Sequence, residues 1–291
     1  MTPQRLYLDL LRKSLVNELY LENEARFLYI AVALQSGQPV DEDTLRNIDA
    51  RRPDLMRTMR TARAHGHPWW KVGVRVAGGE VKALNLRNVC EFSHTMIGSA
   101  RMRNIEDCLD RIREDGVPGD LAETGVWRGG ATVFMRGYLE AYEMPDRQVW
   151  AADSFEGLPV PTHSEDAGRD YSAAVVPILA IGLEEVRELF ARHGLLDERV
   201  RFLKGWFKDT LPNAPIQSLA LLRLDGDLYE STRDALEALY DKVSPGGFII
   251  VDDYGDFLPC RRAVDEFRLA RGITAPLVNI DWSGEYWRKA T

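Results

Sequence analysis

The sequence predicts an α/β protein with a doubly wound, mostly parallel sheet and an α-helical N-terminal extension. Three observations indicate this class. From about residue 100, short apolar runs alternate with stretches of helical period, as in a parallel sheet with crossover helices. The preceding region shows helical spacing without such runs. Polar, glycine-containing clusters directly follow the apolar runs, where open parallel sheets bind their ligands.

The N-terminal region, residues 1–90, is expected to be a helical segment that serves in oligomerisation or as a lid. Leucines between Leu6 and Leu19 recur at intervals of three and four, and residues 22–34 form a second helical stretch. Asp43 or Thr44 is the expected cap of a third helix that runs to about residue 64. Pro53 should break that helix.

Residues 65–88 have no clean period and contain one proline and several glycines. We expect a linker or lid there. The second domain, residues 91–291, should hold the sheet. Its predicted strands are 120–124, 148–152, 200–203, 218–224 and 247–251, and its predicted helices are 130–142, 183–193, 228–243 and 261–270.

Composition narrows the classes of function. The net charge of −8 argues against binding nucleic acid or an anionic membrane surface, both of which need a basic footprint. The three cysteines lack paired spacing, which argues against a disulfide scaffold or zinc site. The start of the chain does not resemble a signal peptide, and no apolar run is long enough to span a bilayer. We therefore expect a cytoplasmic protein.

A glycine-rich turn follows the first predicted strand, in Glu123-Thr-Gly-Val-Trp-Arg-Gly-Gly130. Glycine lets the backbone turn sharply and approach a ligand, although a plain strand-to-helix turn has the same composition. The turn lacks the GxGxxG pattern of dinucleotide sites. Asp153 ends the second strand about 30 residues later; it can bond ribose hydroxyls or cap a turn. Together the two features fit an adenosyl ligand.

Carboxylates follow two further strands. Asp225 ends the fourth strand, and Asp252 and Asp253 end the fifth. If these strands are neighbours, about 4.8 Å apart, the acids converge and repel one another unless a cation is present. Hard oxygen ligands with room for water suit Mg²⁺. Asp253 can instead be a turn residue.

Asp227 is the candidate general base, because it lies beside the acids that would hold the cation. Its alternative role is the N-cap of a helix in a capping box with Glu230. His94 and His163 are rival bases, although a lone histidine is more often a surface or packing residue.

With these residues in hand, the chain resembles the macrocin O-methyltransferase family, from about Ser93 to Arg268. The family methylates hydroxyls, mostly on sugars of antibiotics and other natural products, with S-adenosylmethionine and a metal. The resemblance rests on the motifs Thr95-Met-Ile-Gly98, Gly119–Gly130, Asp153-Ser-Phe-Glu-Gly-Leu-Pro159, Gly205-Trp-Phe207, Leu224–Ser231 and Val251-Asp-Asp-Tyr254.

This resemblance implies a class I methyltransferase fold, Rossmann-like, with S-adenosylmethionine and Mg²⁺ as cofactors. It implies that Asp153 and Ser154 hold the ribose, Gly205 and Trp206 the adenine side, and Asp225, Asp252 and Asp253 the metal, with Asp227 as base. The residues implied to border the rest of the cofactor are Thr95, Met96, Glu123, Gly125, Trp127 and Arg128. The family commonly forms oligomers, so a homo-oligomer is expected. Residues 21–88 look longer than the corresponding segment of the family, so the resemblance leaves the shape of the substrate pocket and the subunit interface open.

Three other functions compete. A catechol-type methyltransferase would share fold, cofactor and metal but act on a phenolic acceptor rather than a glycoside or sugar nucleotide. A nucleotide-binding dehydrogenase belongs to a different class, and the missing GxGxxG argues against it. A non-catalytic module that keeps only the fold is the third alternative.

Overall fold

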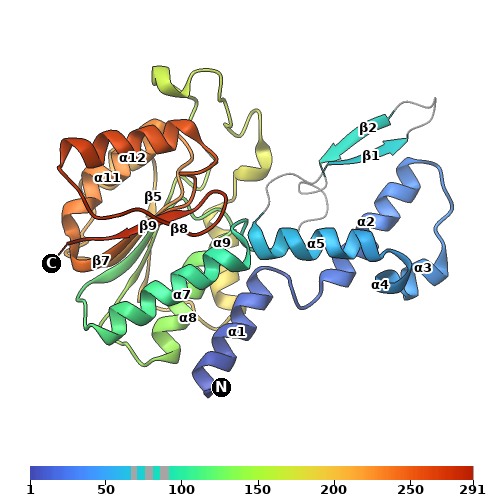
Figure 1. The fold of residues 1–291 in the computed structure, drawn as a ribbon, viewed down its shortest axis with the longest axis horizontal. Helices are drawn as coiled ribbons and strands as arrows, with labels where there is room; N and C mark the ends of the chain where they lie inside the picture. Colours follow the sequence, from blue (N-terminus) through green and yellow to red (C-terminus); the bar gives the residue numbers. More distant parts are fainter. Residues whose placement is uncertain (67–70, 76–80, 86–91, 291) are drawn as a thin grey trace. The chain divides into compact units, whose positions relative to one another are not determined.

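A computed structural model of the chain describes residues 1–66, 71–75, 81–85 and 92–290. Two compact units emerge: Met1–Asp9 with Arg101–Thr291, and Leu10–Ala100. The division falls inside two helices, α1 (Pro3–Leu15) and α7 (Gly98–Glu114), which Figure 1 labels. The oligomerisation or lid role of residues 1–90 stays a prediction.

The unit Leu10–Ala100 is largely helical, as predicted. It contains α2 (Leu21–Gln35), α3 (Glu42–Arg46), α4 (Ile48–Arg51) and α5 (Pro53–His65). Buried apolar side chains of α2, α4 and α5 form its core: Leu21, Ala25, Leu28, Ile48, Met56 and Met59.

The expected break at Pro53 is confirmed, because this residue begins α5, where a missing N–H costs nothing. The expected cap at Asp43 or Thr44 is wrong. Asp41 caps α3, and its carboxylate accepts a hydrogen bond of 2.9 Å from the Thr44 amide.

A short antiparallel hairpin lies in the region predicted as linker or lid. It pairs β1 (Lys71–Arg75) with β2 (Val81–Asn85). These strands mix apolar residues with lysine, arginine, glycine and asparagine, so neither forms the continuous apolar run that marks a buried strand. The remainder of residues 67–91 lies outside the described part of the chain.

The other unit is built on a seven-stranded sheet in the order β5-β4-β3-β6-β7-β9-β8. Its strands are β3 (Asp120–Thr124), β4 (Val149–Asp153), β5 (Val200–Lys204), β6 (Leu219–Leu224), β7 (Val243–Val251), β8 (Val278–Asn279) and β9 (Glu285–Arg288). Strands β3 to β7 are parallel, and β9 runs antiparallel to β7 and β8. The predicted mostly parallel sheet is confirmed.

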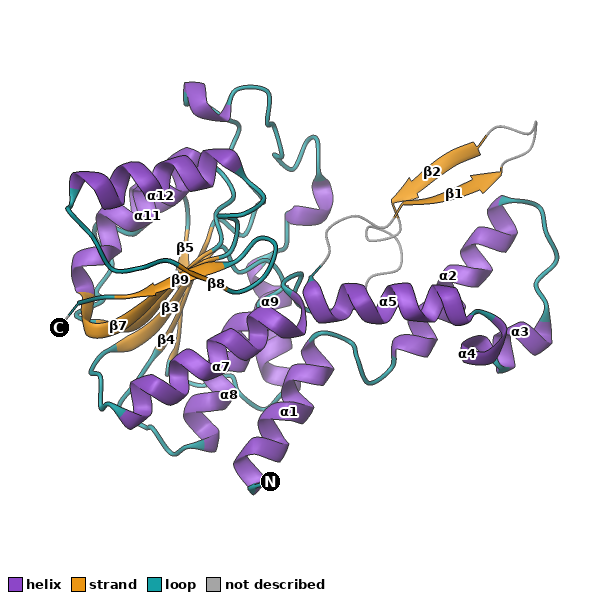
Figure 2. Ribbon diagram, in the orientation of Figure 1, coloured by secondary structure: helices purple, strands orange, loops and turns teal. Residues whose placement is uncertain are grey.

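The helices of this unit are α8 (Gly130–Ala141), α9 (Leu183–Arg192), α10 (Phe207–Thr210), α11 (Tyr229–Leu239) and α12 (Leu258–Ala270). Three 3₁₀ turns accompany them: η1 (Ser164–Asp166), η2 (Pro177–Leu179) and η3 (Tyr240–Lys242). Figure 2 shows α11 and α12 over one face of the sheet and α7 and α8 over the other. The predicted doubly wound arrangement is therefore present.

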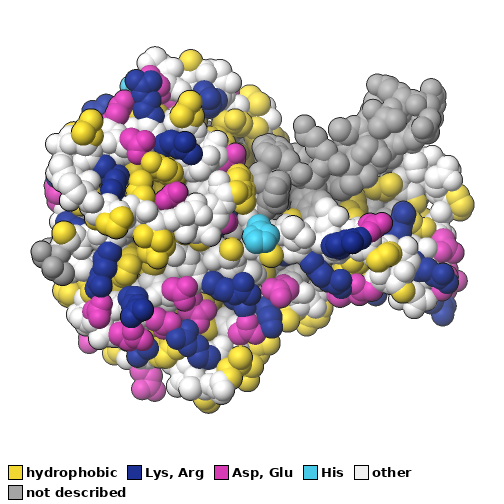
Figure 3. All heavy atoms as spheres, in the orientation of Figure 1, with side chains coloured by type: hydrophobic (Ala, Val, Ile, Leu, Met, Phe, Trp, Pro, Cys, Tyr) yellow, Lys and Arg dark blue, Asp and Glu magenta, His cyan; other side chains and the backbone are white. Residues whose placement is uncertain are grey.

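The core of the sheet explains the near-continuous apolar strands. Every residue of β6 is buried, because helices cover both faces of a parallel sheet. Strand β7 begins four residues earlier than the predicted start at 247, since Pro245 and Gly246 disguise its beginning. On the face drawn in Figure 3, acidic and basic side chains of the described residues are interspersed. Each helix of the described chain is too short or too polar to cross a membrane.

Candidate active site

The sheet reverses its winding between β3 and β6. The chain runs outward from β3 through β4 to β5, then returns to β6 on the other side of β3 and continues to β7. Parallel strands end at the same edge, and such a reversal opens a crevice between the loops there. The structure brings most of the predicted site residues to this edge, namely Glu123, Gly125, Trp127, Arg128, Asp153, Ser154, Gly205, Asp225, Asp252 and Asp253.

The turn after β3 depends on glycine. Gly125 has φ +88°, and a Cβ added to it would overlap the backbone carbonyl of Asp225. Trp127 also has a positive φ, of 47°, which is strained for a bulky residue. Such strain concentrates at functional sites. The indole Nε1 of Trp127 donates to the carbonyl of Ile178 at 2.9 Å, and the Arg128 guanidinium lies 4.4 Å from the Trp127 ring centre.

Asp153 joins the first two loops of the sheet. One of its oxygens accepts hydrogen bonds from the amides of Val126 (2.7 Å) and Trp127 (3.4 Å), and the other accepts from the Phe155 amide at 2.7 Å. The Ser154 hydroxyl donates to the carbonyl of Gly157 at 2.6 Å. Asp153 therefore holds the glycine turn in shape, and a bond to ribose would be additional.

The pair predicted for the adenine side and the pair Thr95 and Met96 lie in two different places. Gly205 follows β5 with φ +139°, and Trp206 is the N-cap of α10. Thr95 and Met96 belong to the unit Leu10–Ala100, where the buried Thr95 hydroxyl accepts from the Ile97 amide at 3.4 Å. The cofactor contacts of all four stay predictions.

A buried ion pair joins β3 to β6 just before the loops at this edge of the sheet. Glu123 and Arg223 are paired in the β3–β6 register, and each is 1% exposed. Arg223 Nη1 donates to Glu123 Oε1 at 2.5 Å, and the Thr132 hydroxyl donates to the other carboxylate oxygen. Burial raises the pKa of Glu123 to about 7, although Arg223 opposes that shift. Glu123 thus links β3 to β6 and to α8 through Arg223 and Thr132.

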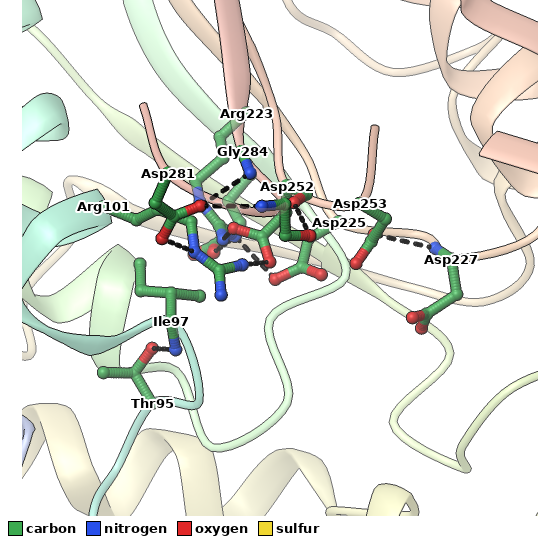
Figure 4. Close-up of polar contacts among 12 residues, drawn as sticks. Thr95, Ile97, Arg101, Arg223, Asp225, Asp227, Asp252, Asp253, Asp281 and Gly284 are labelled. Carbon is green, nitrogen blue, oxygen red and sulfur yellow. Dashed lines mark hydrogen bonds and ion pairs between the residues drawn. The ribbon is translucent and has the colours of Figure 1, made fainter. Parts of the chain in front are cut away.

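The acids that end β6 and β7 converge, as the sequence predicted for neighbouring strands. One carboxylate oxygen from each of Asp225, Asp252 and Asp253 lies within 4.8 Å of the others. Figure 4 shows the three side chains together with two arginines. Burial, followed by repulsion from Asp252, raises the pKa of Asp225 to about 6. Burial and then the nearby Asp227 raise the pKa of Asp253.

Two arginines hold the acids. Arg223 donates through Nη1 to Asp225 at 2.7 Å and through Nη2 to Asp252. Arg101 donates through Nη1 to the other oxygen of Asp252, and through Nε to Asp281 at 3.1 Å. Asp281 in turn accepts from the amides of Ser283 and Gly284. Both carboxylate oxygens of Asp252 are therefore held by arginines from two different elements.

Asp227 follows β6 in a left-handed conformation, with φ +56°. Its amide donates to Asp253 Oδ2 at 3.2 Å, which ties the ends of two strands together. The capping-box alternative is wrong, because the N-cap of α11 is Leu228 and it makes no side-chain cap bond. The buried carboxylate of Asp166 accepts from the amides of Tyr229 (2.8 Å) and Glu230 (3.2 Å) instead.

The rival base His163 has a packing role. Its ring stacks on Tyr229 with centres 4.4 Å apart, and its Nδ1 accepts from the Glu165 amide. His94 lies in the unit Leu10–Ala100, where its amide donates to the carbonyl of Leu15.

Sequence reasoning missed four charged residues of this region, Arg101, Asp166, Arg223 and Asp281. One of them carried a local signal, because Arg223 interrupts an otherwise apolar strand and a buried charge needs partners. The other three meet partners that are 63 to 180 positions away, and no local pattern reveals such pairs.

Comparison with known proteins gives one family. The model of Macrocin-O-methyltransferase (TylF) matches residues 4–289. Demethyldecarbamoylnovobiocin O-methyltransferase of Streptomyces niveus is 54% identical over 200 residues, 68% of this chain and 76% of that protein. Mycinamicin III 3″-O-methyltransferase of Micromonospora griseorubida is 51% identical over 205 residues, 68% of this chain and 79% of that protein.

A third relative, from Streptomyces olivaceus, is named 8-demethyl-8-(2,3-dimethoxy-alpha-L-rhamnosyl)-tetracenomycin-C 4′-O-methyltransferase. It is 53% identical over 198 residues, 67% of this chain and 76% of that protein. Among solved structures, the O-methyltransferase NovP matches with a TM-score of 0.75 and 41% identity, covering 99% of this chain and 100% of NovP. The calicheamicin methyltransferase CalS11 shares the fold, with a TM-score of 0.52 and 23% identity over 65% of this chain and 78% of CalS11.

The fold agrees with these matches, because the doubly wound sheet with its antiparallel end is shared with class I methyltransferases. The dehydrogenase and non-catalytic alternatives are set aside, since the family is enzymatic and transfers methyl groups. The chain therefore belongs to the macrocin O-methyltransferase family and is an O-methyltransferase that uses S-adenosylmethionine.

Proposed function

We propose that this enzyme methylates a hydroxyl of a sugar on an antibiotic-type natural product, with a divalent cation such as Mg²⁺ bound by Asp225, Asp252 and Asp253. The observation that carries this proposal is the convergence of one oxygen from each carboxylate within 4.8 Å, beside the glycine turn. Carboxylate oxygens at few positions, with room for water and substrate, are the ligands that suit Mg²⁺. Asp225 is the most open of the three, with 27% of its side chain exposed.

The acceptor class follows from the relatives. One is named for the 4′ position of a rhamnosyl group, and the others are named for antibiotics. Identity above one half over two thirds of this chain supports the same chemical class of acceptor here. The acceptor is a glycoside or a sugar nucleotide.

The methyl donor lies against the turn after β3. In this proposal Asp153 and Ser154 hold the ribose, and Gly205 and Trp206 border the adenine. The remainder of the cofactor is bordered by Thr95, Met96, Glu123, Gly125, Trp127 and Arg128. The strained backbone of Trp127 and the positive φ of Gly125 support this placement, because they let the main chain approach a ligand closely.

Asp227 acts as the general base. A bound Mg²⁺ supplies positive charge that stabilises a hydroxyl as it loses its proton. The Asp227 carboxylate accepts that proton while the methyl group moves from sulfur to the acceptor oxygen. Its placement is supported by the hydrogen bond from its amide to Asp253, a proposed metal ligand. The first amides of α11 are capped by Asp166 and not by Asp227.

The other expectations belong to the same proposal. The enzyme works in the cytoplasm as a homo-oligomer, with residues 1–90 as an oligomerisation or lid segment and residues 91–291 as the catalytic domain. It does not bind nucleic acid or a membrane. The net charge of −8, together with the interspersed charges on the face drawn in Figure 3, supports this, since a polyanion binds to a concentrated basic surface.

An acceptor panel tests the proposal against the catechol alternative. Purified enzyme is incubated with S-adenosylmethionine, Mg²⁺ and either demethyldecarbamoylnovobiocin, mycinamicin III, a sugar nucleotide or catechol, and S-adenosylhomocysteine formation is measured. We expect turnover of at least one sugar-bearing acceptor. Turnover of catechol alone would replace the proposal with its rival.

Metal removal tests the cation separately. Excess chelator should stop turnover, because Asp225, Asp252 and Asp253 then lose the charge that balances them, and added Mg²⁺ should restore it. Full activity in excess chelator would show that the acids do not act through a metal.

A further inference from the structure

Arg223 makes contacts that the proposed function does not use. It is 1% exposed and lies on β6 at the level of Glu123 on β3 and Ile250 on β7. Side chains two positions apart along a strand share a face of the sheet. The Arg223 side chain therefore reaches both Asp225, two positions after itself, and Asp252, two positions after Ile250.

The contacts divide between the two ends of the guanidinium. Nη1 donates to Glu123 at 2.5 Å and to Asp225 at 2.7 Å, whereas Nη2 donates to Asp252. Nε is buried and has no hydrogen-bond partner in the described part of the chain. Burying a charge this fully costs free energy unless well-placed acids and hydrogen bonds offset that cost.

Arg101 adds a second hold on Asp252. It is 5% exposed and contacts the Asp252 oxygen that Arg223 does not, while its Nε bonds Asp281. Figure 4 shows both guanidinium groups directed at the acids. The carboxylates of this cluster, Glu123, Asp225, Asp252, Asp253 and Asp281, outnumber the two arginines. The arginines therefore orient the acids without cancelling the charge that attracts a cation.

We propose that Arg223, assisted by Arg101, is a positioning residue that sets the spacing of the Asp225 and Asp252 carboxylates for a divalent cation. This inference rests on the proposed metal site. Groups that hold a ligand in orientation commonly change metal affinity by about 10- to 100-fold when they are mutated. A planar guanidinium can bridge acids on neighbouring strands at fixed angles, whereas a lysine ammonium is a point charge on a flexible stem.

The test is Mn²⁺ affinity, measured by calorimetry on the full chain, with S-adenosylhomocysteine affinity measured alongside. In Arg223→Lys the charge remains and the bridge between Asp225 and Asp252 is lost, so we expect Mn²⁺ to bind about tenfold more weakly or worse. Any loss of S-adenosylhomocysteine affinity should be smaller, because Arg223 reaches the proposed cofactor residues only through Glu123. Arg223→Met should also weaken Mn²⁺ binding. If Arg223 acted only as a competing positive charge, the methionine variant would bind Mn²⁺ more tightly, and that result overturns the proposal.

Arg136→Lys is the matched control. Arg136 on α8 is 2% exposed and contacts two carboxylates, against three for Arg223. Its partners, Asp197 and Glu140, are not among the acids of the proposed metal site. It should lower the melting temperature without changing Mn²⁺ affinity. Should Arg223→Lys fail to fold, Arg101→Lys takes its place with the same expectation.

The outcomes distinguish a failure of this inference from a failure of the proposed metal site. Wild-type protein that binds no Mn²⁺ removes the proposed metal site and the inference with it. Wild-type binding with unchanged affinity in Arg223→Lys, or in Arg101→Lys where that variant replaces it, overturns the inference alone.

Discussion

Gly125 and Asp225 meet backbone to backbone at the reversal of the sheet, in a space that excludes even a methyl group on Gly125. The Asp225 amide donates to the carbonyl of Thr124 at 2.8 Å, and the Gly125 amide donates to Ala152 at 2.8 Å. The ends of β3, β4 and β6 are thereby locked together. The turn proposed for the methyl donor and the acids proposed for the metal consequently share one rigid point.

Gly125→Ala should therefore be more destabilising than an ordinary glycine replacement. Gly116→Ala is the matched control, because Gly116 also has positive φ, +62°, but nothing lies within 4 Å of its Cβ position. The control should lose about 1–2 kcal/mol of unfolding free energy from backbone strain. Gly125→Ala should lose more than that and also bind S-adenosylhomocysteine more weakly. Equal losses in urea denaturation would mean that the Asp225 carbonyl moves aside readily.

Asp227→Asn should lower turnover by about 10²- to 10⁴-fold, the usual contribution of a general base. Asparagine tolerates the left-handed conformation that Asp227 adopts, so the turn should survive. Affinity for S-adenosylhomocysteine, measured by calorimetry, should stay near the wild-type value. Undiminished turnover would remove Asp227 from the mechanism.

Asp166→Ala should destabilise the start of α11 by about 0.5–2 kcal/mol, the usual cost of a lost cap, because two amides lose their acceptor. Turnover should fall as well, since Asp227 lies two residues before Tyr229. The control is Ser164→Ala, an exposed position in the same 3₁₀ turn, which should change neither quantity. If both variants behave alike, the cap does not position the Asp227 turn.

Glu123→Gln should change how stability depends on pH. Burial raises the pKa of Glu123 from 4.5 to about 7, so between these values the folded state holds a proton that the unfolded state has released. The contribution of Glu123 to the unfolding free energy is then fully present below pH 4.5 and is lost as the pH rises through about 7. The unfolding free energy of the wild type should thus fall relative to the variant over that range in urea titrations. Parallel curves would contradict the raised pKa.

Much of the fold was predictable from local pattern. The strand β3 was predicted with its observed limits, and β4 and β5 were each predicted to within one residue, because buried parallel strands are short apolar runs between turn residues. The antiparallel strands β8 and β9, two and four residues long, have no such signature. The hairpin β1–β2 was missed because its strands mix apolar residues with charged residues and glycine.

The residues of the site were predictable from the sequence, but the residues that hold them in place were not. Asp225, Asp252 and Asp253 follow apolar strands, so their convergence could be inferred once β6 and β7 were taken as neighbours. Asp227 was ambiguous until Asp166, 63 positions before Tyr229, proved to be the acceptor at the start of α11.

The sequence by itself determined the alternating elements, the acids at the strand ends and the family, because each depends on residues that are neighbours along the chain. Only the tertiary structure decided which charges face one another. Arg101 and Asp252 lie 151 positions apart, and Arg223 meets its acids through the order of the strands in the sheet. Such pairings arise from how β3, β6 and β7 lie side by side, and the cost of burying an unpaired charge makes them obligatory once the strands assemble.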